Sequence, residues 1–169
     1  MEDNSHCNSR LVYHYTVECN FKKILASGVI LPATAGVLPP ERPIVWFSTN
    51  PLWENTVKKG IPFKEDGFFF VETMGWAEFN SCGIPLYRIG VARETAPLRW
   101  RDLRELSLMW PTYASALVRV AKMEYAQSGE WRGTFDPVPV EKWVTVETYN
   151  VQAMRWQEYH EQPSFGRAA

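Results

Sequence analysis

Strand-like and helix-like segments alternate along this chain, and their order is the feature that most restricts its fold. The strand-like segments are short, apolar and bounded by turn residues: 11–16, 29–32, 43–49, 84–92, 131–135 and 142–149. The helix-like segments carry capping residues or a helical apolar period: 17–27, 50–60, 101–109 and 112–127. This order predicts an α+β domain in which helices flank a small, split, mixed sheet.

Two of these helices carry specific expectations. Asn50 is placed to cap the helix over 50–60, with Pro51 at its first position. The helix over 112–127 is apolar apart from a stripe of Ser115, Arg119 and Lys122, so we expect it to pack closely against the rest of the domain.

Length and composition favour one soluble domain. The 169 residues are 46% hydrophobic and 22% charged, which fits a single domain over 1–169 with flexible ends at 1–9 and 161–169. A net charge of −1 provides no general attraction to nucleic acid or to anionic membranes. The polar start and the lack of a run of about 18 apolar residues predict a cytoplasmic protein without a membrane segment.

The motifs of several large enzyme classes are missing from the sequence. Cys7, Cys19 and Cys82 are far apart and form no CxxC pair, so neither a disulfide framework nor a metal site is expected. The chain also lacks the GxGxxG, P-loop, HExxH and GxSxG patterns. Any chemistry must therefore come from residues that are dispersed along the sequence.

Three segments supply candidate site residues. In LVYHYT, His14 and Thr16 share one face of a predicted strand. The buried strand that follows ends in aromatic and hydroxyl side chains, Trp46, Phe47, Ser48 and Thr49. Late in the chain, Glu141 and Glu147 lie at the start and near the end of another strand.

These segments resemble a known family. LVYHYT resembles the first strand of the His-Tyr-Glu ADP-ribosyltransferases, in which one residue separates the histidine from a Ser or Thr. FKKILASGVI resembles the helix and glycine step that come next, and IVWFST is similar to the strand that carries the family's tyrosine. The resemblance covers residues 11–58, with Trp46 in place of the usual tyrosine and Tyr15 where many members have glycine.

The resemblance implies an ADP-ribosyltransferase-like fold and a role for each segment. NAD would be the substrate, and ADP-ribose would pass to a macromolecular acceptor, either protein or nucleic acid. The residues implied to bind NAD come from the two early strands: His14, Tyr15, Thr16, Trp46, Phe47 and Ser48. The catalytic glutamate would be Glu141, with Glu147 as the alternative, and it would stabilise an oxocarbenium-like transition state.

Other interpretations stay open. The domain could keep this fold as a non-catalytic binding module, with His14 as a core residue, or act as an RNA 2′-phosphotransferase-like enzyme. A run of arginines around Trp100 is typical of a phosphate-binding surface or of a solvated helix start: Arg88, Arg93, Arg99, Arg101 and Arg104.

Overall fold

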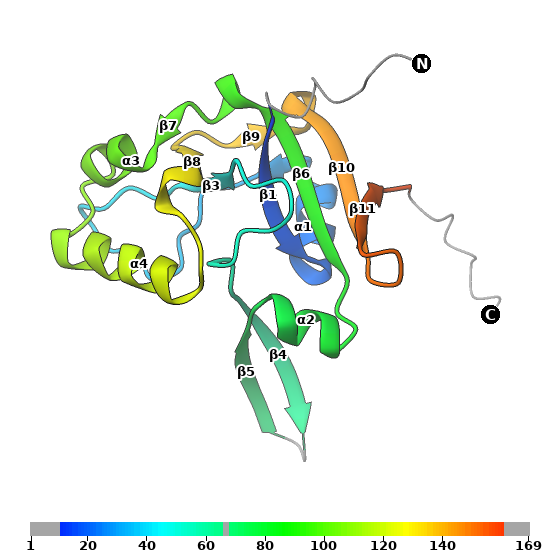
Figure 1. The fold of residues 1–169 in the computed structure, drawn as a ribbon. Helices are drawn as coiled ribbons and strands as arrows, with labels where there is room; N and C mark the ends of the chain where they lie inside the picture. The colour runs from blue at the N-terminus through cyan, green and yellow to red at the C-terminus, as the bar shows by residue number, and fades with distance from the viewer. Residues whose placement is uncertain (1–10, 66–67, 161–169) are drawn as a thin grey trace.

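A seven-stranded antiparallel sheet organises the protein, as seen in a computed structural model that describes residues 11–65 and 68–160 (Figure 1). The strand order is β11-β10-β6-β1-β3-β8-β7. The strands are β1 (Leu11–Val17), β3 (Val45–Ser48), β6 (Leu86–Ala92), β7 (Leu98–Arg99), β8 (Trp131–Thr134), β10 (Trp143–Asn150) and β11 (Arg155–Glu158). The predicted flexible ends, 1–9 and 161–169, lie outside the described residues.

The two neighbours of β1 hold it very differently. β6 pairs with β1 along all seven residues, from Leu11 to Val17. On the other side, β3 is in register with β1 through a single pair, Tyr13 and Ser48. The sheet is therefore continuous but weakly joined between β1 and β3, and this junction is where the pocket described below lies.

Helices and two small sheets complete the fold. The helices are α1 (Glu18–Ser27), α2 (Trp76–Ser81), α3 (Trp100–Leu106) and α4 (Pro111–Met123), with 3-10 turns η3 (Arg93–Thr95), η4 (Ser128–Glu130) and η5 (Val140–Lys142). The small sheets pair β2 (Val29–Ile30) with β9 (Val138–Pro139) and β4 (Lys59–Glu65) with β5 (Phe68–Met74). The β4–β5 hairpin projects away from the large sheet, while α3 and α4 lie beyond β8 (Figure 1). None of the described helices has the length and apolar character needed to cross a membrane.

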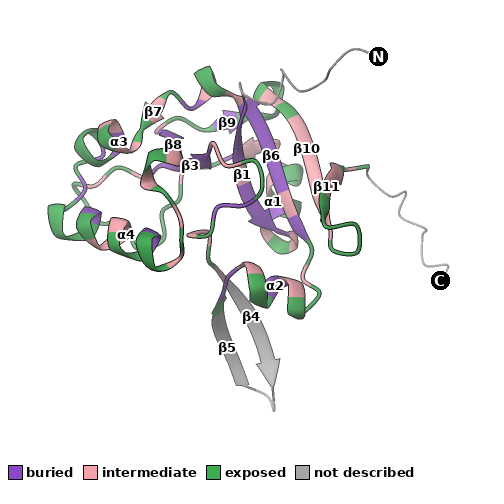
Figure 2. Ribbon diagram, in the orientation of Figure 1, coloured by how far each residue is buried: buried purple, intermediate pink, exposed green. Residues whose placement is uncertain are grey.

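β1 is buried along most of its length (Figure 2). Its alternating side chains join two different core clusters, one on each face of the sheet. Val12 packs on one face with Phe21 of α1, where left-handed Gly28 (φ +66°) ends the helix. Tyr13 and Tyr15 pack on the other face. Each fully buried large side chain contributes about 1.5–3 kcal/mol, so β1 is fixed from both sides.

The α+β class is confirmed, but the predicted sheet was wrong in detail. The large sheet has seven strands, and all the pairings between its described strands are antiparallel rather than mixed. Two of these strands were not predicted because β7 has only two residues and β11, with the sequence RWQE, is mostly polar.

The helix predicted over 50–60 is also wrong, because its first carbonyl groups are used elsewhere. Among the carbonyls of residues 50–52, Asn50 accepts a hydrogen bond from the Tyr15 hydroxyl and Pro51 accepts one from Arg88. The third, on Leu52, accepts a bond of 2.7 Å from the Trp156 indole N–H. A helix would need these same carbonyls for its own bonds. The segment instead forms a loop that leads into β4.

Candidate functional site

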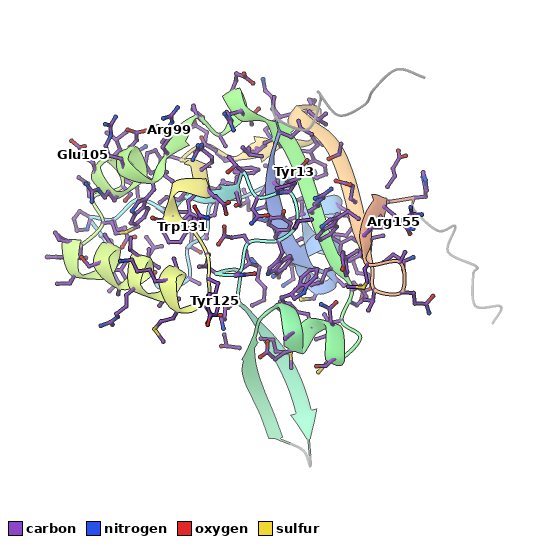
Figure 3. The ribbon with its side chains drawn as sticks, in the orientation of Figure 1. Tyr13, Arg99, Glu105, Tyr125, Trp131 and Arg155 are labelled. Atoms are coloured by element: carbon purple, nitrogen blue, oxygen red, sulfur yellow. The ribbon has the colours of Figure 1, made fainter. Side chains whose placement is uncertain are left out.

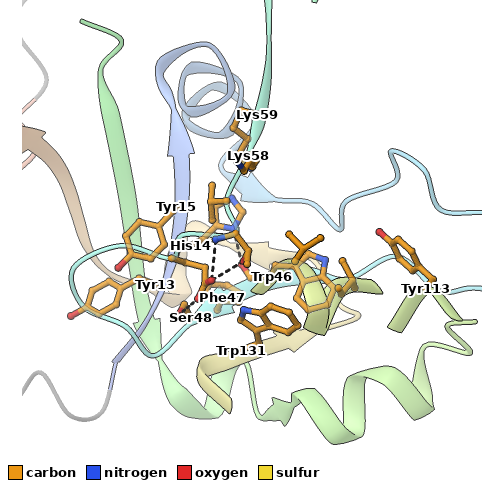
Figure 4. Close-up of a pocket in the computed structure, with 15 residues that line it drawn as sticks. Tyr13, His14, Tyr15, Trp46, Phe47, Ser48, Lys58, Lys59, Tyr113 and Trp131 are labelled. Carbon is orange, nitrogen blue, oxygen red and sulfur yellow. Dashed lines mark hydrogen bonds between the residues drawn. The ribbon is translucent and has the colours of Figure 1, made fainter. Parts of the chain in front are cut away.

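A pocket of about 350 Å³ opens where β1 and β3 separate (Figure 4). This volume is within the range of small-molecule sites. Its walls come from β1, β3, the loop after β3, the start of β4, α4 and β8. The side chains that matter for its chemistry are His14, Trp46, Phe47, Glu54, Lys59 and Trp131.

His14 is held in one orientation and is neutral. Its Nδ1 lies 2.9 Å from the carbonyl oxygen of Trp46, and because a carbonyl only accepts, Nδ1 carries the proton. Burial, and to a smaller extent the charge of Lys59, lower the pKa of His14 to about 4 against the opposing effect of the Trp46 carbonyl. At neutral pH the ring therefore keeps Nε2 as a hydrogen-bond acceptor, and Nε2 has no partner among the described residues.

Aromatic rings surround this histidine. The ring of Phe47 meets His14 edge-on at a centroid distance of 5.8 Å. Trp46 packs in the same manner on Trp131 at 6.2 Å. The Nε1–H of Trp131 is buried and has no hydrogen-bond partner among the described residues, so a ligand that offers an acceptor here would satisfy it. These surfaces suit a flat ring that carries polar groups at its edge.

A buried carboxylate, Glu54, lines the pocket and was missed by the sequence analysis. Its side chain is 5% exposed, and its oxygens accept bonds from the hydroxyls of Ser48 (2.9 Å) and Thr56 (2.7 Å). Glu54 fell within the helix predicted over 50–60, so no role in a site was expected for it. One signal was available, since Glu54 is the only acidic residue between positions 42 and 64.

Two lysines border the pocket: Lys58 at the end of the loop before β4 and Lys59 at the first position of β4 (Figure 4). Burial lowers the pKa of Lys59, while Cys19 opposes this change. Its neighbour Lys58 is exposed and forms an ion pair of 2.9 Å with Glu124. The pocket therefore has a cationic side next to a neutral histidine and a carboxylate.

The structure brings most of the predicted NAD-binding residues together. His14, Tyr15, Trp46, Phe47 and Ser48 all line the pocket. Thr16 does not line it, although its side chain is only 1% exposed.

Neither predicted glutamate lines the pocket. Glu141 is exposed in η5 and lines a separate hollow with Glu94 and Asp136. The other, Glu147, is engaged by Arg88 through two bonds of 2.7 Å. The order of strands in the sheet explains this placement. Glu147 lies in β10 and Glu141 just before it, and two strands, β6 and β1, separate β10 from β3.

A different glutamate, Glu130, lies next to a pocket residue in the chain, although it is not itself among the residues that line the pocket. It directly precedes β8, which is paired with β3, and the next residue, Trp131, lines the pocket. The Asn50 amide donates to its carboxylate at 3.3 Å, and the Thr49 N–H donates to its backbone carbonyl at 2.9 Å. Its place could not be predicted from the sequence, because the pairing of β8 with β3 joins residues that lie far apart in the chain.

Helix α4 forms one wall of the pocket rather than packing closely into the core as expected. Only Ala114 and Ala121 are buried, while Tyr113, Leu117 and Val120 line the pocket. The apolar side chains of α4 that predicted close packing therefore lie partly on the wall of the open pocket.

No group of three or more metal-ligating side chains occurs among the side chains that the structure describes. The polar groups of the site include a fixed neutral imidazole, a buried carboxylate and two lysines, beside aromatic walls. Comparisons with protein-family models, curated protein sequences and solved structures find no match to this chain.

Proposed function

We propose that the protein is an NAD-dependent ADP-ribosyltransferase that binds NAD in the pocket between β1 and β3. The proposal rests on the resemblance of residues 11–58 to the His-Tyr-Glu family. The observation that carries it is the fixed, neutral His14, whose free Nε2 accepts a hydrogen bond from a ribose hydroxyl. The aromatic walls provide a stacking surface for nicotinamide.

The carboxylate assignment changes in this proposal. The resemblance implies a glutamate that precedes a strand. Glu130 precedes β8, the strand next to β3, whereas Glu141 precedes β10, which β6 and β1 separate from β3. Neither Glu130 nor Glu141 is among the residues that line the pocket, so the choice of Glu130 rests on strand order. Glu130 would stabilise positive charge on the ribose as the bond to nicotinamide breaks and its electrons leave with the ring. Glu54, held by Ser48 and Thr56, would position the end of β3.

Nicotinamide release from NAD by the purified protein tests this proposal. The reaction is followed by chromatography, with labelled NAD to detect transfer to protein or nucleic acid offered as acceptor. We expect His14→Ala and Glu130→Gln to lower the rate by about 100-fold or more, as loss of a transition-state contact does in other enzymes. Glu141→Gln is the matched control, since it removes an exposed carboxylate outside the pocket, and its rate should equal that of the wild type.

The same purified proteins also distinguish the two alternative functions, a non-catalytic binding module and an RNA 2′-phosphotransferase. A binding module that lost its chemistry would release no nicotinamide, and its biological function would survive His14→Ala. An RNA 2′-phosphotransferase would remove the phosphate from a 2′-phosphorylated oligonucleotide in an NAD-dependent reaction. Absence of NAD turnover, together with no shift in melting temperature on adding NAD, would reject NAD as substrate.

A further inference from the structure

Three arginines gather at the edge of the large sheet, away from the pocket. β7 is the last strand of the sheet and carries Arg99 (Figure 3). Arg99 is paired directly opposite Arg132 of β8. Arg93 belongs to η3, just before β7, and its charge and that of Arg99 both act on Arg132. None of the three lines the β1–β3 pocket.

The arginine run in the sequence contributes only two of these side chains. Arg88 is neutralised by Glu147 within the sheet, and Arg101 is 82% exposed beside Asp102. Arg104 is exposed on α3. Arg93 and Arg99 remain, and the fold adds Arg132 from a distant strand.

Arg132 is the fixed member of the cluster. Its side chain is largely buried, with the residue 9% exposed, and its Nη1 donates to the carbonyls of Gly129 (2.9 Å) and Trp131 (2.7 Å). Burial lowers its pKa, and the charges of Arg93 and Arg99 lower it further. A guanidinium nevertheless stays protonated, so the charge remains.

No carboxylate among the described residues forms an ion pair with Arg93, Arg99 or Arg132. Asp102 acts on Arg132 through its charge, but its oxygens also accept the backbone N–H of Arg99 at 3.1 Å and face Arg101 at 3.6 Å. Like charges directly opposite each other on paired strands destabilise a sheet. An anion bound between them would remove this repulsion.

We propose that Arg93, Arg99 and Arg132 form a binding site for a phosphate group at the β7 edge of the sheet. Planar guanidinium groups bind phosphate oxygens in pairs, and two exposed arginines beside an anchored one can approach a phosphate from several sides. The site does not depend on the proposed NAD activity. Its phosphate comes from a small molecule or from a nucleic acid, and the test distinguishes these sources.

Titration calorimetry of the full chain with inorganic phosphate, pyrophosphate and a short single-stranded oligonucleotide tests the site. Arg99→Gln is the main variant because its side chain is exposed and makes no side-chain hydrogen bond within the described residues. We expect it to weaken binding about tenfold, the loss of one charge-assisted contact. Arg104→Gln is the matched control, since it removes the same charge from the neighbouring helix α3 and should leave binding unchanged.

A second measurement keeps the test independent of affinity. If the arginines repel one another, Arg99→Gln should raise the melting temperature in phosphate-free buffer, whereas Arg104→Gln should not. Binding of phosphate or pyrophosphate that depends on Arg99 indicates a small-molecule source, and binding of the oligonucleotide alone indicates a nucleic acid. The proposal is overturned if no ligand binds, or if both variants weaken binding equally.

Discussion

Lowering the pH should destabilise the protein through His14. Its pKa is about 4 in the folded chain, against 6.5 for an unperturbed histidine. The unfolded state therefore binds the proton more tightly. The contribution of His14 to stability is complete above pH 6.5, is lost as the pH falls toward 4, and changes no further below that.

The size of this effect follows from the two pKa values. Between pH 7 and pH 4.5 the linkage relation predicts a loss of about 2.5 kcal/mol in the free energy of unfolding from His14 alone. For a domain with 5–15 kcal/mol of total stability this is a large fraction. Carboxylates titrate over part of the same pH range, so measurements on the wild type alone do not separate the contribution of His14 from theirs.

The contribution of His14 is obtained by comparing urea unfolding of the wild type and of His14→Asn at pH 7 and at pH 4.5. An asparagine amide can still donate to the Trp46 carbonyl but does not titrate. We expect the variant to lose about 2.5 kcal/mol less than the wild type over this interval. His160→Asn, at a largely exposed histidine, should behave as the wild type. Equal pH dependence in wild type and His14→Asn would refute the buried, neutral assignment.

Two further substitutions test the packing of the large sheet. Glu147→Ala leaves the buried Arg88 guanidinium without its carboxylate, so we expect the free energy of unfolding in urea to fall by about 3 kcal/mol. A fall below about 1 kcal/mol would contradict the buried pair. Gly90→Ala puts a methyl group 2.4 Å from Thr145 Oγ1 and should destabilise the protein by about 2 kcal/mol, whereas Gly129→Ala meets open space and should be nearly neutral. Similar melting temperatures for these two variants would contradict the register of β6 and β10.

The strands that the sequence predicted well are those with a long, regular ladder. The segments 11–16 and 84–92 correspond to β1 and β6, which pair with each other over seven residues. Their alternating pattern reflects burial on both faces, so it is readable locally. By contrast, β9 and β7 have two residues each, too few for any periodicity to appear.

The helix predicted over 50–60, in place of the loop after β3, was wrong for a different reason. Asn50 and Pro51 are good helix-start residues, and nothing nearby argues against a helix. What overrides them is a set of donors 35 to 104 residues away in the chain, on β1, β6 and β11. The same long-range contacts place Glu54 in the pocket, so the missed carboxylate and the wrong helix have a single cause.

Resemblance located the early half of the candidate site but not its later parts. The segments LVYHYT and PIVWFST pointed to a shared pocket, and His14 and Trp46 do line one. Glu130 and Arg132 escaped notice because their positions depend on β8 pairing with β3 and β7, which the sequence pattern does not specify.

The hydrogen bond from Trp156 to the Leu52 carbonyl joins two residues that are synthesised at very different times. Trp156 follows Leu52 by 104 residues, so a ribosome working at about 5–20 residues per second makes the two about 5–20 s apart. When Leu52 has been made, the residues of β1, α1 and β3 are already in the chain, whereas Arg88 and Trp156, two of the three donors to the loop after β3, are made later. A nascent chain therefore contains His14 and Trp46 before it contains the indole that binds the Leu52 carbonyl, so this hydrogen bond forms only after β11 has been synthesised.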